Sequence, residues 1–386
     1  MKIRESINKF SEEIKKNRRA LHQIPEIGLD TVKTAAYLKQ KGMEYGVDLI
    51  DDSLLKNSVI MQINANHETK QSVGLRSDMD ALPLLEMSGV EFVSLHEGCM
   101  HACGHDGHMA TMLATIQYCC EHRSELKQNI IFVFQPGEEG PGGAELMIKN
   151  GLFKKYKIDK MIGMHVMSDQ PSGTIGCCSG PLMARNGEFQ FNVLGKSAHG
   201  ATPQDGRDAI VAASSLILNL QSIVARNVDP IETGVITVGV IHGGQARNVI
   251  ADRVEVLGTM RAFDDSIYEL MKKRMNEVAK GIESMFDCIV EVEIIDYYGV
   301  VNNDASLVRM LEEVAQEDYI QVKPRMISED FSFYQQEVPG IFYFCGVGDA
   351  QHTRLIHDTA FNFNEEALLN GVEVNISMLE KLGVLC

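Results

Sequence analysis

The sequence is short of positive charge: 36 Lys and Arg residues stand against 53 Asp and Glu residues, which gives a net charge of −17 at pH 7. A surface of that charge repels phosphate, and no basic stripe interrupts it, so we expect no nucleic-acid partner. Long hydrophobic runs are also missing. No stretch approaches the ~20 apolar residues that a membrane-spanning helix needs, so we expect no membrane partner.

Signals for export and for disulfide bonding are absent as well. Residues 1–26 form a charged helical pattern without the apolar segment of a signal peptide. Nine cysteines in 386 residues do not make a disulfide framework, and the odd number favours reduced thiols. We therefore predict a cytoplasmic protein. The chain also lacks a phosphate-binding loop, a dinucleotide-binding glycine motif and a Gly-x-Ser-x-Gly motif, which disfavours kinases, dehydrogenases and serine hydrolases.

The length of 386 residues exceeds what one ordinary core holds and predicts two domains. Residues 185–297 show the order strand, helix, strand, strand, helix, strand, which is that of a ferredoxin-like α+β unit. Such a unit can form its own core. We therefore predict that it is inserted into an α/β catalytic domain, which consists of residues 1–184 and 298–386.

In the catalytic domain, the hydrophobic pattern alternates between helical and extended periods. The expected helices cover residues 4–22, 31–41, 107–123 and 143–150, and the expected strands cover 58–65, 72–77, 129–134, 160–164 and 341–344. We expect Gly42 to end the second helix, because glycine commonly follows the last helical turn.

The stretch Met100–His108 concentrates the chemistry of the chain. It holds three His, one Cys and one Asp in nine positions, together with two glycines that let the backbone bend. Thiolate and imidazole are good donors for divalent transition metals. Cys103 and His105 are therefore candidate metal ligands.

Further acidic and imidazole groups follow other predicted strands. Asp78 and Asp80 come just after the strand at 72–77, where α/β sheets usually form their sites, although a capped turn would also use Asp. Glu138 and Glu139 stand side by side in a Gly/Pro-rich turn after a buried strand. They repel each other, which favours a functional pair over a solvated acidic turn. His165 is expected at the end of the strand 160–164, either as a ligand or as a structural histidine.

Two divalent ions held close together can polarise a carbonyl and generate hydroxide from water. The candidate ligands are Cys103, His105, Glu139, His165 and His357. A thiolate can bridge two metals, so Cys103 is the candidate bridge. Glu138 is then free as general base, taking a proton from metal-bound water and passing it to the leaving amine. Asp80, either alone or together with Asp78, would orient the histidine ligands.

The inserted domain supplies candidates for substrate contact. His199, in a loop after a strand, could donate a hydrogen bond to the developing oxyanion, or it could be a polar turn residue. Asn248 and Arg261 could hold a substrate carboxylate, or lie on the surface. In the catalytic domain, Gly346–Gly348 is expected to form a turn that brings backbone N–H groups to the substrate, or simply a turn near the sheet edge.

Five motifs together resemble the M20 metallopeptidase family, and they span nearly the whole chain: Arg76–Pro83, Met100–Asp106, Gln135–Gly140, Gly163–His165 and Ser328–Phe331. Within that family the chain is similar to the amidohydrolase branch of hippurate hydrolases, auxin-conjugate hydrolases and bacterial N-acetyl-amino-acid deacetylases. Two further stretches, Gly140–Ala144 and Ile223–Pro230, look most like those of N-acetyldiaminopimelate deacetylases, which are enzymes of lysine and cell-wall biosynthesis.

The resemblance implies a two-metal α/β catalytic domain with an inserted ferredoxin-like lid that dimerises. It places the ligands on the same five residues, the base on Glu138, and the active-site Asp on Asp78 or Asp80. It also implies that His199 reaches the neighbouring subunit's site in dimeric relatives, and that Mn²⁺, Zn²⁺, Co²⁺ or Ni²⁺ serves as the metal. The chain departs from the family pattern at Gly137, where Ala is commoner, and at Asp358, which follows His357 in place of His, Ser or Pro.

We therefore predict a metal-dependent amidohydrolase that cleaves the amide of an N-acyl, specifically N-acetyl, amino acid, with N-acetyldiaminopimelate as the candidate substrate. The same site would also suit a dipeptidase, a carboxypeptidase or a hippurate hydrolase, and a non-catalytic metal-binding relative is the remaining alternative. The expected partners are the small-molecule N-acyl amino acid and a second copy of the chain, which would bind through the edge strands of the inserted domain.

Overall fold

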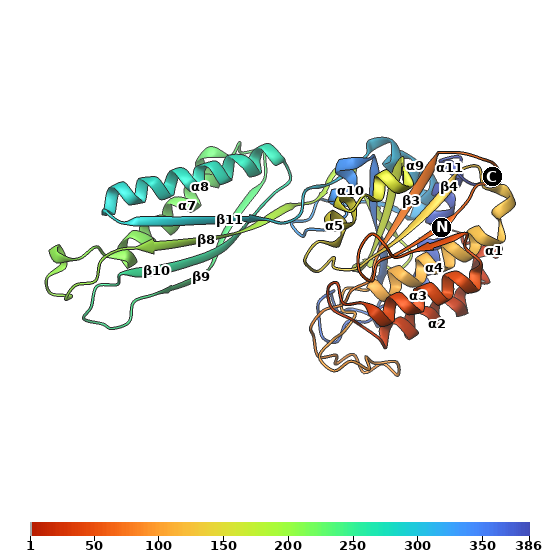
Figure 1. Ribbon diagram of the computed structural model, residues 1–386, viewed down its shortest axis with the longest axis horizontal. Helices are drawn as coiled ribbons and strands as arrows, with labels where there is room; N and C mark the ends of the chain where they lie inside the picture. Colours follow the sequence, from red (N-terminus) through yellow and green to blue (C-terminus); the bar gives the residue numbers. More distant parts are fainter. Residues whose placement is uncertain (1) are drawn as a thin grey trace. The chain divides into compact units, whose positions relative to one another are not determined.

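The computed structural model describes residues 2–386 and divides the chain into two compact units (Figure 1). The first unit runs to Leu182 and resumes at Asn302–Lys323 and Asp330–Cys386. The second unit consists of Met183–Val301 and Pro324–Glu329. The short segment Pro324–Glu329, which the sequence assigned to the catalytic domain, thus packs with the inserted part of the chain.

The first unit is built on an eight-stranded sheet with the order β1-β2-β4-β3-β5-β14-β6-β13. The strands are β1 Leu49–Asp51, β2 Val59–Ile63, β3 Ser72–Asp78, β4 Asn129–Gln135, β5 Lys160–Pro171, β6 Ile175–Cys177, β13 Tyr319–Gln321 and β14 Gly340–Gly348. The four central strands, β4, β3, β5 and β14, are parallel. They are buried along almost their whole length, as expected for parallel strands covered on both faces.

Helices cover this sheet (Figure 1). They are α1 Glu5–Asn8, α2 Ser11–His22, α3 Val32–Tyr45, α4 His105–Glu121, α5 Gly143–Lys149, α6 Leu152–Tyr156, α9 Ala305–Ala315, α10 Ser332–Glu337 and α11 Leu368–Lys381, with 3-10 turns at Arg123–Glu125, Gln316–Asp318 and Glu365–Ala367. Helix α4 packs on β3, β4 and β5 and is flanked by α2, α3 and α11. Along the sheet, the connection from β3 through α4 to β4 runs toward β1. The connection from β4 through α5 to β5 runs in the opposite direction, toward β13. Right-handed crossovers therefore place α4 and α5 on opposite faces, with a topological switch beside β3.

The second unit has its own core. Its strands and helices are β8 Arg185–Leu194, α7 Ala209–Asn227, β9 Gly234–Gly243, β10 Arg253–Ala262, α8 Asp265–Phe286 and β11 Ile289–Asp296, with a 3-10 turn at Pro203–Asp205. The sheet order β11-β8-β10-β9, antiparallel throughout, is the ferredoxin-like order that the sequence predicted. Asp208 and Asp264 cap α7 and α8 by accepting backbone N–H bonds. Strands β7 Gly180–Met183 and β12 Val301–Asn303 form a separate two-stranded sheet.

One helix is more apolar than the sequence analysis expected. Among residues 2–386, α7 is long and hydrophobic enough to cross a membrane by length and composition. Six of its residues are nevertheless buried in the core of the second unit: Ala209, Ala212, Ala213, Leu216, Leu220 and Ile223. This apolar face is what a helix needs to cover a four-stranded sheet, and it fits a soluble protein.

Several element boundaries differ from those predicted. The first helix is interrupted between α1 and α2. Helix α3 continues through Gly42, where a Cβ atom would lie 2.9 Å from the side chain of Met61, and it ends at Gly46, whose φ of 75° suits glycine. Strand β5 extends to Pro171, so that His165 lies inside the strand and not at its end. Gly346–Gly348 belongs to β14, and the turn predicted there is wrong.

Candidate functional site

The site lies at the carboxyl ends of the parallel strands of the first unit, where α/β folds usually bind ligands. Eight predicted residues come together there from five stretches of the chain: Asp78, Asp80, Cys103, His105, Glu138, Glu139, His165 and His357. Asp78 ends β3, and His165 lies in β5. His105 begins α4, and the two glutamates form the turn after β4.

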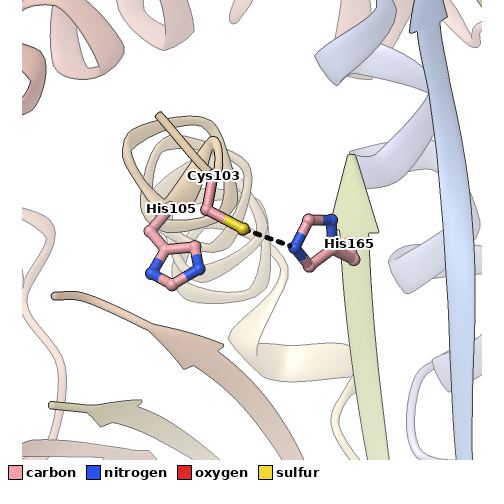
Figure 2. Close-up of side chains that lie close together, drawn as sticks. All are labelled: Cys103, His105 and His165. Atoms are coloured by element: carbon pink, nitrogen blue, oxygen red, sulfur yellow. Dashed lines mark hydrogen bonds between the residues drawn. The ribbon is translucent and has the colours of Figure 1, made fainter. Parts of the chain in front are cut away.

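Two groups of metal donors share Cys103. Cys103, His105 and His165 offer ligand atoms within 4.8 Å of one another, and so do Cys103, Glu139 and His357. The Sγ atom of Cys103 lies 3.3 Å from Nε2 of His165 and 3.3 Å from Nε2 of His357. Figure 2 shows Cys103 and His105 facing His165 from the start of α4. A shared thiolate between two donor groups is the arrangement that a bridging ligand requires.

Hydrogen bonds set the imidazoles for metal binding. His105 donates from Nδ1 to the carbonyl oxygen of Asp80 at 2.8 Å, and His165 donates from Nδ1 to the carbonyl oxygen of Val166 at 2.7 Å. These bonds place a proton on Nδ1 of each ring, so Nε2 is the nitrogen that would bind an ion after losing any proton of its own. Nε2 of His105 is buried and has no hydrogen-bond partner among residues 2–386. A buried nitrogen without a partner, in a group of metal donors that includes a thiol, fits a site for divalent cations.

The glutamate turn is held by Asp80. Its carboxylate accepts the backbone N–H of Glu138 at 3.0 Å and that of Glu139 at 3.1 Å. From the sequence, Asp80 is predicted to orient the histidine ligands. Its carboxylate lies 3.7 Å from Nδ1 of His105, and its backbone carbonyl accepts the hydrogen bond from that nitrogen. Asp80 thus contacts the His105 ring and the Glu138–Glu139 turn at once. The Glu138 side chain is buried, with Oε2 3.9 Å from Nε2 of His105.

Asp78 belongs to a buried chain of polar groups that the sequence analysis did not assign. It accepts hydrogen bonds from Arg76 at 2.7 Å and from Nδ1 of His108 at 2.7 Å. Arg76 also donates to Asp330 at 2.7 Å and to Gln135 at 3.0 Å. Burial would raise the pKa of Asp78, but His105, His108 and Arg76 hold that pKa well below its usual value.

Metal binding is expected to tighten as the pH rises from 6 to 8. Burial, followed by Glu139 and Glu138, raises the pKa of Cys103 well above its usual value. Burial lowers the pKa of His105, but Asp78 and Asp80 outweigh it and raise that pKa to about 10. Both groups are therefore protonated near neutral pH before an ion binds, and they must lose the proton to become ligands.

Titration calorimetry in buffers of different ionisation enthalpy should therefore detect proton release when Mn²⁺ or Zn²⁺ binds. For each proton released, the dissociation constant should fall by up to about tenfold per pH unit. An affinity that is equal at pH 6 and pH 8, without proton release, would contradict this ligand set.

The remaining candidates belong to the second unit. His199 is exposed, and its Nδ1 accepts the backbone N–H of Ala201. Asn248 is also exposed. Arg261 is half-buried and donates from Nη1 to the carbonyl oxygen of Met326 at 2.8 Å, so part of its hydrogen-bonding capacity holds the Pro324–Glu329 segment. Burial lowers the pKa of Arg261. The roles of these three residues toward a substrate stay predictions.

A parallel α/β sheet that carries paired metal-donor groups and a buried carboxylate at its carboxyl edge defines a metal-dependent hydrolase. The chain belongs to peptidase family M20/M25/M40, whose sequence pattern matches residues 74–381. This membership makes the protein a metal-dependent amide hydrolase.

Curated relatives cover nearly the whole chain. The chain is 36% identical over 369 residues to the N-acetyldiaminopimelate deacetylase of Halalkalibacterium halodurans. The aligned residues make up 95% of this chain and 98% of that enzyme. It is also 36% identical over 373 residues to the enzyme of the same name from Priestia megaterium, with coverage of 96% and 97%.

Solved structures extend the likeness to the fold. A protein of methicillin-resistant Staphylococcus aureus, provisionally named an aminohydrolase, superposes with a TM-score of 0.92 at 31% identity and covers 98% of each chain. A Bacillus subtilis protein described as a dinuclear metal-binding peptidase of the M20 family superposes with a TM-score of 0.86 at 30% identity, covering 97% of this chain and 99% of that one.

Proposed function

We propose that this enzyme removes the acetyl group from N-acetyldiaminopimelate, releasing acetate and a free amine, as a step of lysine and cell-wall precursor formation. The observation that carries the reaction type is the pair of donor groups sharing Cys103, with Glu138 beside them. The substrate is supported by the names of relatives that are 36% identical over more than nine-tenths of the chain.

Two divalent ions fit the donor set of Cys103, His105, Glu139, His165 and His357. When bound, such ions polarise the scissile carbonyl and lower the pKa of water. A thiolate with three imidazoles favours Zn²⁺, Co²⁺ or Ni²⁺ over ions that prefer only oxygen ligands, whereas the carboxylate also suits Mn²⁺. One ion would be held by Cys103, His105 and His165, and the other by Cys103, Glu139 and His357.

Glu138 is the general base in this mechanism. It takes a proton from the attacking water as the C–O bond forms, and it delivers that proton to the amide nitrogen as the C–N bond breaks. Asp80 holds the backbone of the Glu138–Glu139 turn through the N–H bonds described above, which limits the movement of the base during the reaction. Water supplies one oxygen of the acetate and the hydrogen added to the amine nitrogen.

Three residues of the second unit are proposed as substrate contacts. In the proposal His199 donates a hydrogen bond to the oxyanion, from the same chain or from a partner subunit, and Asn248 and Arg261 hold a carboxylate of the substrate. We further propose that the enzyme is a cytoplasmic homodimer that associates through this unit. Edge strand β9 is open to solvent along most of its length and leaves backbone groups available for such pairing.

Amine release from a substrate panel tests the proposal. Chelator-stripped protein would be assayed with and without Mn²⁺, Zn²⁺, Co²⁺ or Ni²⁺ against N-acetyldiaminopimelate, other N-acetyl amino acids, hippurate and dipeptides. We expect release only with metal and the highest kcat/KM for N-acetyldiaminopimelate. A preference for dipeptides would replace the proposal by a peptidase, a preference for hippurate would replace it by a hippurate hydrolase, and ion binding without any turnover would favour a non-catalytic role.

A further inference from the structure

The central strands β3 and β5 separate beside the site. Their parallel register runs from the pair Val73–Lys160 to the pair Arg76–Gly163 and ends there. Beyond this point β3 stays with β4 as far as Asp78, while β5 continues along β14. The edge of β5 that faced β3 therefore loses its strand partner just before His165.

The N–H of Val166 points toward this edge. Met161 donates its N–H to Pro339 on the β14 side, and N–H groups alternate between the two sides of a strand, so even-numbered residues of β5 donate toward β3. A buried backbone N–H without an acceptor costs free energy. The N–H of Val166 instead donates to Nε2 of His108 at 2.9 Å.

His108 thus fills the gap between the two strands. The ring is buried and spans from Nδ1, which donates to Asp78 at the end of β3, to Nε2, which accepts from Val166 in β5. Because the N–H of Val166 can only donate, Nε2 must be unprotonated, and the bond to Asp78 places the proton on Nδ1. The tautomer of His108 is fixed from both sides.

Val166 links His108 to the candidate metal ligand His165. The carbonyl of the same Val166 accepts the Nδ1–H of His165. The rings of His108 and His165 also pack edge to face, with their centroids 4.5 Å apart. His108 therefore fixes the backbone residue that sets the direction of the His165 ring.

We propose that His108 is a positioning residue of the metal site: it stands in for the missing strand, holds Val166, and so fixes His165 as a ligand. The inference rests on the proposed metal site but not on the identity of the substrate. His108 itself binds neither ion, since both of its nitrogens are committed to hydrogen bonds.

Three substitutions separate this role from simple packing. His108→Leu removes both hydrogen bonds. His108→Asn keeps a donor near Asp78 but is too short to reach Val166, whereas His108→Gln places an acceptor near the former Nε2 position. The matched control is His122→Gln just after the same helix, where the ring hydrogen-bonds to the carbonyl of Tyr118 and stacks on the Tyr118 ring, away from the site.

The first readout is Zn²⁺ and Mn²⁺ affinity, measured by chelator competition without any substrate. We expect the affinity of one of the two ions to fall by about 10-fold to 100-fold in His108→Leu and His108→Asn, to recover in His108→Gln, and to stay unchanged in His122→Gln. The second readout is hydrogen–deuterium exchange of the peptide covering β5, which should speed up in His108→Leu and His108→Asn and be restored in His108→Gln. With metal present, kcat should fall more than KM changes.

Wild-type affinity for both ions in His108→Asn would overturn the proposal, as would equal losses in His108→Asn and His108→Gln. If His108→Leu does not fold, the Asn and Gln variants still decide. Both main readouts are independent of turnover. A wild-type protein that binds two ions but leaves N-acetyldiaminopimelate intact would therefore refute the proposed substrate and leave the role of His108 open to the same test.

Discussion

Glu138→Gln is expected to lower kcat by about 10²-fold to 10⁴-fold, the usual contribution of a general base, while both ions remain bound. Glutamine has nearly the same size and keeps the backbone N–H bond to Asp80, so the turn should stay in place. It cannot accept a proton from water at neutral pH. The loss should therefore appear in kcat, with little change in KM.

Glu139→Gln provides the contrast, because Glu139 is assigned to the metal. Its lost activity should recover in part when excess metal is added, whereas that of Glu138→Gln should not. Glu145→Gln on α5 is the matched control, since Glu145 forms only a partly exposed ion pair with Lys149. The measurement is steady-state amine release together with metal content per chain. A Glu138→Gln variant that turns over at the wild-type rate would remove Glu138 from the chemistry.

The sequence could indicate the candidate ligands because several of them stand in a distinctive local pattern. Cys103 and His105 share a loop rich in donors, and Glu138 with Glu139 forms a repulsive pair that a purely structural turn would avoid. The structure brings all of these groups to one edge of the sheet. Their roles in metal binding and proton transfer stay predictions until the variants above are measured.

Long-range pairing explains what the sequence could not show. The apolar pattern of β5 seemed to end at Met164, but pairing with β14 continues to Pro171 and places His165 inside the strand. The glycines at 346 and 348 suggested a turn, yet a glycine at 346 is required because a Cβ atom there would lie 2.2 Å from the carbonyl oxygen of Pro171. Local propensity does not contain this information.

Positioning residues were missed for a related reason. His108 lies three residues after His105, on the same side of α4, and this spacing was a usable signal. Arg76 and Asp330 stood out in the sequence only as parts of motifs. Their pairing could not be predicted, because an ion pair between residues 254 positions apart leaves no local sequence pattern. Their effect can be stated once the fold brings them together.

Arg76→Met is expected to destabilise the first unit by about 3–5 kcal/mol, the usual cost of removing one partner from a buried ion pair. The guanidinium is fully buried and donates to Asp78 and to Asp330. Without it, both carboxylates lose the buried cation that they share. Chemical denaturation should therefore show an earlier transition for the first unit. Lys381→Met, which removes an exposed ion pair with Glu313, should change the free energy of unfolding by at most about 1 kcal/mol.

The double variant Arg76→Met with Asp330→Asn distinguishes the effect of an uncompensated buried charge from that of lost packing. Asn is close in size to Asp but neutral, and its side-chain oxygen can still accept the N–H of Ala144, which now donates to Asp330 at 3.0 Å. If the destabilisation of Arg76→Met comes mainly from the uncompensated carboxylates, the double variant should be more stable than Arg76→Met alone. If the destabilisation comes from lost packing around the arginine side chain, the second substitution should lower the free energy of unfolding further. A double variant less stable than Arg76→Met would therefore rule out the electrostatic explanation at Asp330.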